Sequence, residues 1–315
     1  MTLSSYDGAA LQLDPTSHRL DPTFPFGALA WSRFCGDCVA ESHGRWQLSW
    51  RLGWSFACIR HNRLLADACP ECGKYQRRQQ IYRRVPTPTM CACGCSLETT
   101  QTLGLPTDSA VVEAQRQIFD IINEGHTSFG VFGSDGPSVR KVLAAVRSLA
   151  NRVLNYASTH GLAAVESAGI SLCLPEEDAD LKPLRARNAL NEKAPSGAVE
   201  TAVGVTVALD ILRCSSIRDA GIRARSFIAG QNADTGPAEL RSCARDDDLA
   251  AAVVMRARSI YMGPELQLRY RTAITMLCAP DLEVRQVQSI ADALPAAMWP
   301  EWSQRLLPDA LDAVP

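Results

Sequence analysis

The sequence lacks the short motifs by which several large enzyme classes are recognised. It has no glycine-rich phosphate loop, no G-x-S-x-G nucleophile motif and no H-E-x-x-H zinc-protease motif. It also begins without a cationic, apolar leader, and its most apolar windows, such as TAVGVTVALDIL, span about twelve residues, too few to cross a bilayer. We therefore expect a cytoplasmic protein that is not a standard enzyme and does not enter a membrane.

The whole chain has little net charge, only −2, but its charges are unevenly distributed. Residues 31–100 hold ten Lys or Arg against five Asp or Glu, a local net charge of +5, and the segments on both sides are net negative. A basic module attached to an acidic body indicates a polyanionic partner for that module.

Cysteine, by contrast, is plentiful and concentrated in one region. Eight of the 12 cysteines lie between Cys35 and Cys95. Because disulfides are rare in a reducing cytoplasm, such a cluster indicates metal or redox chemistry. The other four are single and typical of small apolar core residues: Cys173, Cys214, Cys243 and Cys278.

The clustered cysteines form short pairs, each of which can reach one ion from a single tight turn. The pairs are C-x-x-C in FCGDC, C-x-x-H in CIRH and C-x-x-C in CPECG, followed by the closing group CACGC. Nineteen residues separate the first pair from the second, and eighteen separate the third from the closing group, which matches the spacing of four-ligand zinc sites. We predict two structural zinc ions, the first held by Cys35, Cys38, Cys58 and His61 and the second by Cys69, Cys72, Cys91 and Cys93.

Two alternatives remain open within this prediction. The seven residues between His61 and Cys69 also allow an interleaved pairing, although sequential sites are simpler. In the second site, glycine follows both Cys72 and Cys93, and a glycine after the second ligand of a turn permits a positive φ. This favours Cys91 with Cys93 as the closing pair, but pairs that include Cys95 are not excluded.

Three catalytic interpretations fit the same residues less well. CGDC resembles a thioredoxin-like redox pair, but no βαβ pattern follows it. A nucleophilic dyad of Cys58 and His61 is disfavoured, because a C-x-x-H turn directs both side chains at a metal ion rather than at each other. A catalytic zinc ion would need an open coordination position, and here four protein ligands fill each site.

A basic segment, KYQRRQQIYRR, lies between the two turns of the second site. Guanidinium groups bind phosphate bidentately, and interleaved tyrosines can stack or donate hydrogen bonds, so the segment favours nucleic-acid binding. The alternative is a solvated hairpin between two zinc turns. The candidate nucleic-acid-binding residues are Lys74, Arg77, Arg78, Arg83 and Arg84.

Tryptophans and helical periodicity complete the predicted architecture. Trp31, Trp46, Trp50 and Trp54 are expected to form mostly core. From about residue 106, apolar residues recur at helical spacing in TDSAVVEAQRQIFDIINEG and GPSVRKVLAAVRSLANRVLNYASTHG, the second of which has a basic face expected to be solvated. Further helices are expected near 199–213, 217–229, 247–260, 264–278 and 283–294.

We predict a fold that is mainly α with a small N-terminal double zinc-ribbon-like (α+β) module. The expected parts are a weakly structured arm at 1–30, a double zinc-binding module at 31–104 and an α-helical domain at 105–315, with a polar linker near 171–198.

The metal turns resemble those of the TniQ family, which includes TnsD-like proteins. The shared features are a cysteine pair, a tryptophan-rich segment ending in WRL, C-x-x-H followed by LL, C-P-x-C-G and a closing cysteine turn, all present between residues 31 and 100. Family members select target sites in transposition. The resemblance implies a non-enzymatic zinc-containing adaptor that binds DNA or a guide-RNA effector complex and recruits an AAA+ ATPase, which in turn engages the transposase.

The same resemblance implies that the eight predicted ligands hold two structural zinc ions and that the protein is associated with the nucleoid. Against the family pattern the chain looks shortened at both ends, with about thirty residues before the first cysteine pair and thirteen after Trp302. The alternatives are a stand-alone DNA-binding regulator, a decayed transposon remnant or, in poorer agreement with the metal turns, a thiol- or metal-dependent enzyme. Dimerisation and the target DNA stay open.

Overall fold

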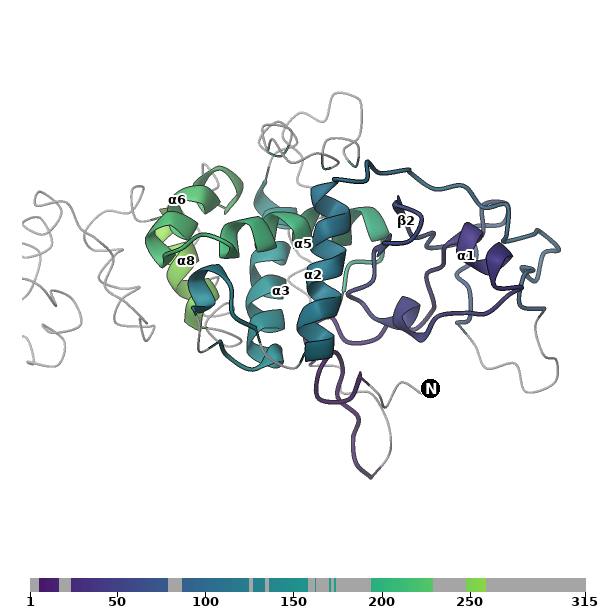
Figure 1. The fold of residues 1–315 in the computed structure, drawn as a ribbon, viewed down its shortest axis with the longest axis horizontal. Coiled ribbons are helices and arrows are strands. Elements are labelled where there is room, and N and C mark those ends of the chain that lie inside the picture. Colours follow the sequence, from purple (N-terminus) through teal and green to yellow (C-terminus); the bar gives the residue numbers. More distant parts are fainter. Residues whose placement is uncertain are drawn as a thin grey trace, which may run out of the picture.

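The part of the chain that the structure describes is mostly helical. The computed structural model describes residues 6–16, 24–78, 87–124, 127–133, 136–157, 194–228 and 248–258, together with residues 162, 170 and 173. Helix α2 (Ala110–Glu124) lies next to the cysteine-rich region, with most of the other helices on its far side (Figure 1). No helix among these residues is long and apolar enough to span a bilayer.

The cysteine-rich region is built from turns and very short elements: α1 (Gly36–Glu41), the 3-10 helix η2 (Leu48–Arg51), β1 (Ala57–Cys58) and β2 (Arg63–Leu64). The two strands pair antiparallel, with Ala57 opposite Leu64. The tryptophan-rich segment from Trp46 to Trp54 contains a single regular element, η2. It then approaches another chain segment at Gly53, where a Cβ atom would lie 2.1 Å from the carbonyl oxygen of Phe26.

The remaining helices follow the predicted periodicity. They are α3 (Val139–Tyr156), α5 (Ala198–Leu212), α6 (Ile217–Ile228) and α8 (Asp248–Arg258), with the 3-10 helix η3 (Gly130–Phe132) between α2 and α3. Among the described residues, the mostly helical structure with a small two-stranded sheet near the N-terminus confirms the predicted fold class. The helices expected at 264–278 and 283–294, and most of the polar linker, lie outside the described residues.

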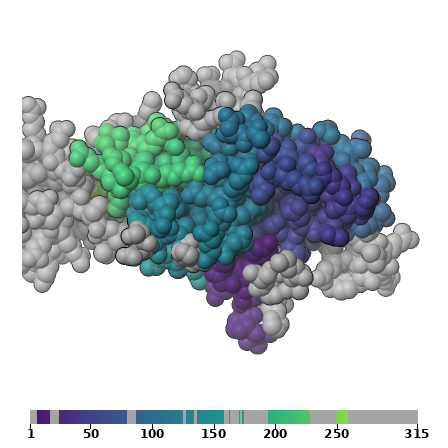
Figure 2. Space-filling view, in the orientation of Figure 1, coloured from purple at the N-terminus to yellow at the C-terminus, as the bar shows by residue number. Residues whose placement is uncertain are grey.

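One hydrophobic core connects the helices to the N-terminal part of the chain. Leu11, Trp54 and Phe56 are buried in the same cluster as the apolar faces of α2, α3 and α5. In the space-filling view, the purple and blue surface of the cysteine-rich region continues into the teal surface of α2 and α3 (Figure 2). The described part of the arm thus packs on the core without forming a helix or strand, and the three-part division of the chain stays a prediction.

A buried glutamine fixes β1 to α2. Gln115 is fully buried in α2. Its Oε1 accepts the backbone N–H groups of Phe56 at 2.7 Å and Ala57 at 3.0 Å, and its Nε2 donates to the carbonyl oxygen of Trp54 at 3.2 Å. These bonds satisfy backbone groups that would otherwise be buried without partners, so the strand carrying Cys58 is held on a long helix.

A buried arginine ties the cysteine-rich region to α5. Arg33 is 0% exposed, and its Nε lies 2.8 Å from Oδ1 of Asp67. Its Nη1 donates to the carbonyl oxygen of Ser55 at 2.6 Å and its Nη2 to Oγ1 of Thr201 at 3.1 Å, while Oδ2 of Asp67 accepts the N–H of Ala198 at the start of α5. Burial lowers the pKa of Arg33, and the Asp67 carboxylate opposes that shift.

The basic face predicted for α3 is only partly solvated. Arg140 and Lys141 are exposed, and Arg140 donates to Gln12 Oε1 at 2.8 Å. Arg147 and Arg152 are each only 2% exposed, so the expectation of a fully solvated face is wrong. Helix α3 packs against α5, α6 and α8, so it is covered on more than one side.

Candidate metal centres

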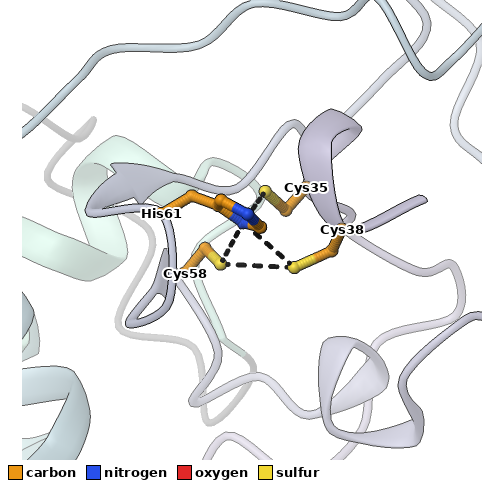
Figure 3. Close-up of side chains that lie close together, drawn as sticks. All are labelled: Cys35, Cys38, Cys58 and His61. Atoms are coloured by element: carbon orange, nitrogen blue, oxygen red, sulfur yellow. Dashed lines mark hydrogen bonds between the residues drawn. The ribbon is translucent and has the colours of Figure 1, made fainter. Parts of the chain in front are cut away.

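The first candidate centre joins two turns that are far apart in the sequence. Cys35 directly precedes α1 and Cys38 lies in its first turn. Cys58 ends β1, and His61 lies in the turn between β1 and β2. The four side chains converge on one another, with the imidazole ring of His61 facing the three sulfur atoms (Figure 3).

The spacing of these ligand atoms fits a tetrahedral metal ion. Nδ1 of His61 lies 3.5 Å, 3.2 Å and 3.5 Å from the Sγ atoms of Cys35, Cys38 and Cys58, and the last two sulfurs are 3.5 Å apart. A zinc ion with bonds of about 2.3 Å to sulfur and about 2.0 Å to nitrogen would separate its ligand atoms by about 3.5–3.8 Å. A disulfide would need about 2.05 Å. The group can therefore hold a metal ion.

The outer nitrogen of the histidine ring is held by a carboxylate. Nε2 of His61 lies 3.1 Å from Oε1 of Glu41, and Nη2 of Arg60 lies 3.0 Å from the other oxygen of Glu41. Metal-binding histidines usually donate their second ring N–H to such a group, which fixes the tautomer and the ring orientation. This arrangement leaves Nδ1 for the ion.

Burial and close packing shift the pKa values in the first group. Burial lowers the pKa of His61, but the hydrogen bonds with Glu41 and Cys58 raise it by more. Hydrogen bonds with Cys35 and Cys38 lower the pKa of Cys58, and hydrogen bonds with the other two thiols raise that of Cys38. The three sulfurs are thus close enough to interact strongly as their charges change.

The second candidate centre consists of cysteines alone. The Sγ atoms of Cys69 and Cys93 are 3.7 Å apart, and those of Cys72 and Cys91 are 3.6 Å apart. All four sulfurs lie within 4.8 Å of one another. These separations also fit the edges of a tetrahedron around zinc.

Glycines form the tight turns of the second centre, as the sequence predicts. Gly73 has φ of 65° and Gly94 has φ of 94°, a region of backbone conformation that side chains disfavour. The N–H of Gly73 donates to the carbonyl oxygen of Cys69 at 3.0 Å, and the N–H of Gly94 donates to that of Cys91 at 2.9 Å. Each turn therefore brings its two cysteines to one side.

Cys95 lies beside the second group rather than in it. Its thiol donates to the carbonyl oxygen of Ser96 at 3.4 Å, and its own carbonyl accepts the N–H of Cys91 at 2.9 Å. Burial raises the pKa of Cys91, but hydrogen bonds from the Cys93 backbone and from Gln76 lower it by more, to about 6. The structure groups Cys91 and Cys93 with Cys69 and Cys72. The assignment of these four as metal ligands stays a prediction.

The two centres share a small hydrophobic cluster. Phe34, Trp50 and Leu97 pack there with cysteines of both groups. At Gly36, in the turn of the first centre, a Cβ atom would lie 2.6 Å from the carbonyl oxygen of Thr100. The segment that closes the second centre thus packs directly on α1, so the two centres belong to one structural unit.

The structure describes three of the five candidate nucleic-acid-binding residues. Lys74 and Arg78 are exposed, and Arg77 is half-buried. Arg83 and Arg84 lie outside the described residues. The three described cations follow the first turn of the second centre, where the carbonyl oxygen of Lys74 accepts the N–H of Cys69 at 3.0 Å.

Two aromatic contacts at this surface were not predicted from the sequence. Trp31 stacks on Tyr75 with 4.5 Å between ring centroids, and the guanidinium carbon of Arg77 lies 4.7 Å from the ring centroid of Trp46. Trp50 and Trp54 are buried, as expected for core residues, whereas Trp31 and Trp46 are only half-buried. In the sequence, the interleaving of tyrosines with arginines indicates aromatic contacts in this segment, but it does not identify Trp31 and Trp46 as the partners.

Comparison with known protein families gives a match at the beginning of the chain. Residues 1–65, about a fifth of the 315 residues, are similar to the TniQ family model. The matched segment contains all four side chains of the first candidate centre and none of the second. No curated protein and no solved structure matches the chain.

Proposed function

We propose that this chain, whose first 65 residues match the TniQ family, is a non-enzymatic, zinc-braced adaptor in DNA transposition. It would select or mark target DNA and recruit an AAA+ ATPase, with the transposase or a guide-RNA effector complex as further partners. One observation carries the proposal: the four side chains brought together at the first centre all fall within the family match, at separations that suit a tetrahedral ion.

The proposed metal ions have a structural role. Zinc would supply crosslinks between turns that have few apolar residues of their own. Three residues of the chain support these sites. Glu41 orients His61, Gln115 fixes the strand that carries Cys58, and Arg33 joins the module to α5. Because each group offers four protein ligands, the sites suit a brace better than catalysis.

The basic side chains near the second centre are the proposed DNA contacts. Lys74, Arg77 and Arg78 lie together in the sequence directly after Cys72, in a region whose local net charge is +5. Cations on such a surface release counterions from DNA when they neutralise phosphates, so binding weakens as salt rises. Arg83 and Arg84 belong to the same proposed interface.

Affinity capture tests the proposed partner. The zinc-loaded full chain should retain an AAA+ ATPase from cells that carry a transposition system, and should bind duplex DNA with an affinity that falls steeply with salt. The Cys58→Ser variant should lose both properties, whereas the matched Cys214→Ser variant, which changes a cysteine outside both centres, should keep them. DNA binding without ATPase capture would instead favour a stand-alone DNA-binding regulator.

A further inference from the structure

Trp46, Arg77 and Pro88 form a contact that links the two centres at the surface, and we call it the Trp46 clasp. The guanidinium carbon of Arg77 lies 4.7 Å from the centroid of the Trp46 ring. The carbonyl oxygen of Pro88 accepts two hydrogen bonds, from Nε1 of Trp46 at 2.8 Å and from Nη2 of Arg77 at 3.5 Å. Residues from three separate segments therefore meet at one point.

The tryptophan of this clasp is a fixed platform. Its ring packs on Phe34 with 5.5 Å between centroids and meets Trp50 edge-on at 5.6 Å. Phe34 and Trp50 belong to the hydrophobic cluster that contains the cysteines of both centres. An arginine stacked on Trp46 is therefore positioned by the metal-braced unit rather than by its own flexible side chain.

The backbone at Arg77 is also constrained. Its φ is 55°, in the left-handed region that a residue with a Cβ rarely adopts and that persists where surrounding structure imposes it. The neighbouring Gln76 supplies this constraint: its Nε2 donates to Sγ of Cys91 at 3.4 Å, and its carbonyl oxygen accepts the N–H of Ser32 at 2.9 Å. The position of Arg77 is thus coupled to the second centre.

We propose that Arg77 is a pre-organised phosphate contact for DNA and that Trp46 is its positioning residue. This inference rests on the proposed function, since it names how that function's basic surface holds a phosphodiester. A guanidinium stacked on an indole uses its face, so the N–H groups at its edge that do not donate to Pro88 stay able to bind phosphate. Lysine has no planar group and cannot be held in the same way.

The neighbouring cations provide the contrast. Lys74 and Arg78 are exposed, whereas Arg77 is half-buried against the platform. An exposed, flexible cation attracts the DNA backbone but must be ordered on binding, which reduces its net contribution. Exchanging arginine for lysine should therefore weaken DNA binding more at position 77 than at position 78.

The test measures binding of the zinc-loaded full chain to a non-specific DNA duplex by fluorescence anisotropy over a series of salt concentrations. Arg77→Lys should weaken binding by about threefold to tenfold with an unchanged salt slope, because the charge is kept and the stacking is lost. Arg77→Ala should lower the magnitude of that slope by about one. Arg78→Lys is the comparison at an exposed contact and should weaken binding by less than Arg77→Lys does. The matched control is Arg116→Lys on α2, where Arg116 pairs with Glu113 and is not a proposed DNA contact, and it should bind as the unaltered chain does.

Trp46→Leu tests the positioning role. It should weaken binding without changing the salt slope, and combining it with Arg77→Ala should add little to the loss caused by Arg77→Ala alone. The metal content and the thermal midpoint of each variant show whether it still folds. If Trp46→Leu does not fold, Trp46→Phe takes its place: it keeps a ring and should retain part of the DNA affinity of the unaltered chain.

The outcomes separate this inference from the proposed function. If the unaltered chain binds DNA with strong salt dependence but Arg77→Lys binds equally well, or if the effects at positions 46 and 77 simply add, the clasp has no positioning role. If the unaltered chain shows no salt-dependent binding at all, the proposed DNA contact fails and the inference fails with it.

Discussion

The two candidate centres offer the same number of ligands in very different surroundings. In the first, all three cysteines are buried, and the histidine is held by a carboxylate. In the second, Cys93 is exposed, and the ligands are cysteines alone. The first lies within the segment that matches the TniQ family, and the second lies beyond it, next to the basic surface.

The difference indicates a division of roles within one unit. The first centre is attached to the helical core, because β1, which carries Cys58, is bonded to Gln115 of α2. The second centre is linked to the basic surface, because Gln76, the residue before Arg77, donates a hydrogen bond to Sγ of Cys91. We therefore infer that the first centre mainly stabilises the fold and that the second mainly shapes the contact surface.

Removing one ligand from each centre should show the difference between the two centres most strongly. Cys38→Ser should abolish zinc binding at the first centre. It should also lower the free energy of unfolding by more than about 5 kcal/mol, since structural zinc supplies about 10–16 kcal/mol of apparent binding energy in small zinc modules. Cys93→Ser should lose the second metal ion while the helical core stays folded. Elemental analysis and circular dichroism of both variants measure these effects, with two zinc ions expected in the unaltered chain.

The opposite result would reverse the assignment of roles. If Cys93→Ser unfolds the helices while Cys38→Ser leaves them intact, the second centre is the one that supports the core. Cys214→Ser is the control for the loss of a thiol alone, because Cys214 belongs to neither group.

The buried ion pair tests the link from the first centre to the helices. Arg33→Met should destabilise the chain by about 3–5 kcal/mol, because it leaves Asp67 and the backbone carbonyls around Arg33 without their buried partner. Arg116→Gln is the control: its pair with Glu113 is solvent-exposed, so its loss should cost less than about 1 kcal/mol. Urea unfolding followed by circular dichroism measures both values. An equal effect of the two changes would show that Arg33 does not carry this link.

The features that could be predicted from the sequence depend on neighbouring residues. The C-x-x-C and C-x-x-H turns, the positive φ at Gly73 and Gly94, and the periodic faces of α2 and α3 each involve residues within a few positions of one another. Side chains three or four residues apart on a helix lie on the same face, whatever the rest of the chain does. The grouping of eight potential ligands into two sets could be predicted because the spacings are characteristic.

The features that could not be predicted join distant segments. Arg33 meets Thr201, and Trp46 meets Arg77, and no local pattern marks either partner. Arg147 and Arg152 have the periodicity of a solvated face but are buried, because helix α3 packs against several other helices. A residue's own spacing shows which face it shares, but burial of that face depends on the packing of elements far away in the chain.

The smallest expected difference concerns the residue behind the histidine. Glu41→Gln keeps an oxygen near Nε2 of His61 but removes the negative charge that increases the ring's basicity, so affinity at the first centre should fall by about tenfold to a hundredfold. Glu71→Gln is the matched change at the second centre, where no ring needs orienting, and it should have little effect. Competition with a chromophoric zinc chelator resolves the two metal ions by their rates of release. Because Glu41 also pairs with exposed Arg60, an Arg60→Gln variant should leave the release rate unchanged, and a faster release there would assign the effect to that ion pair instead.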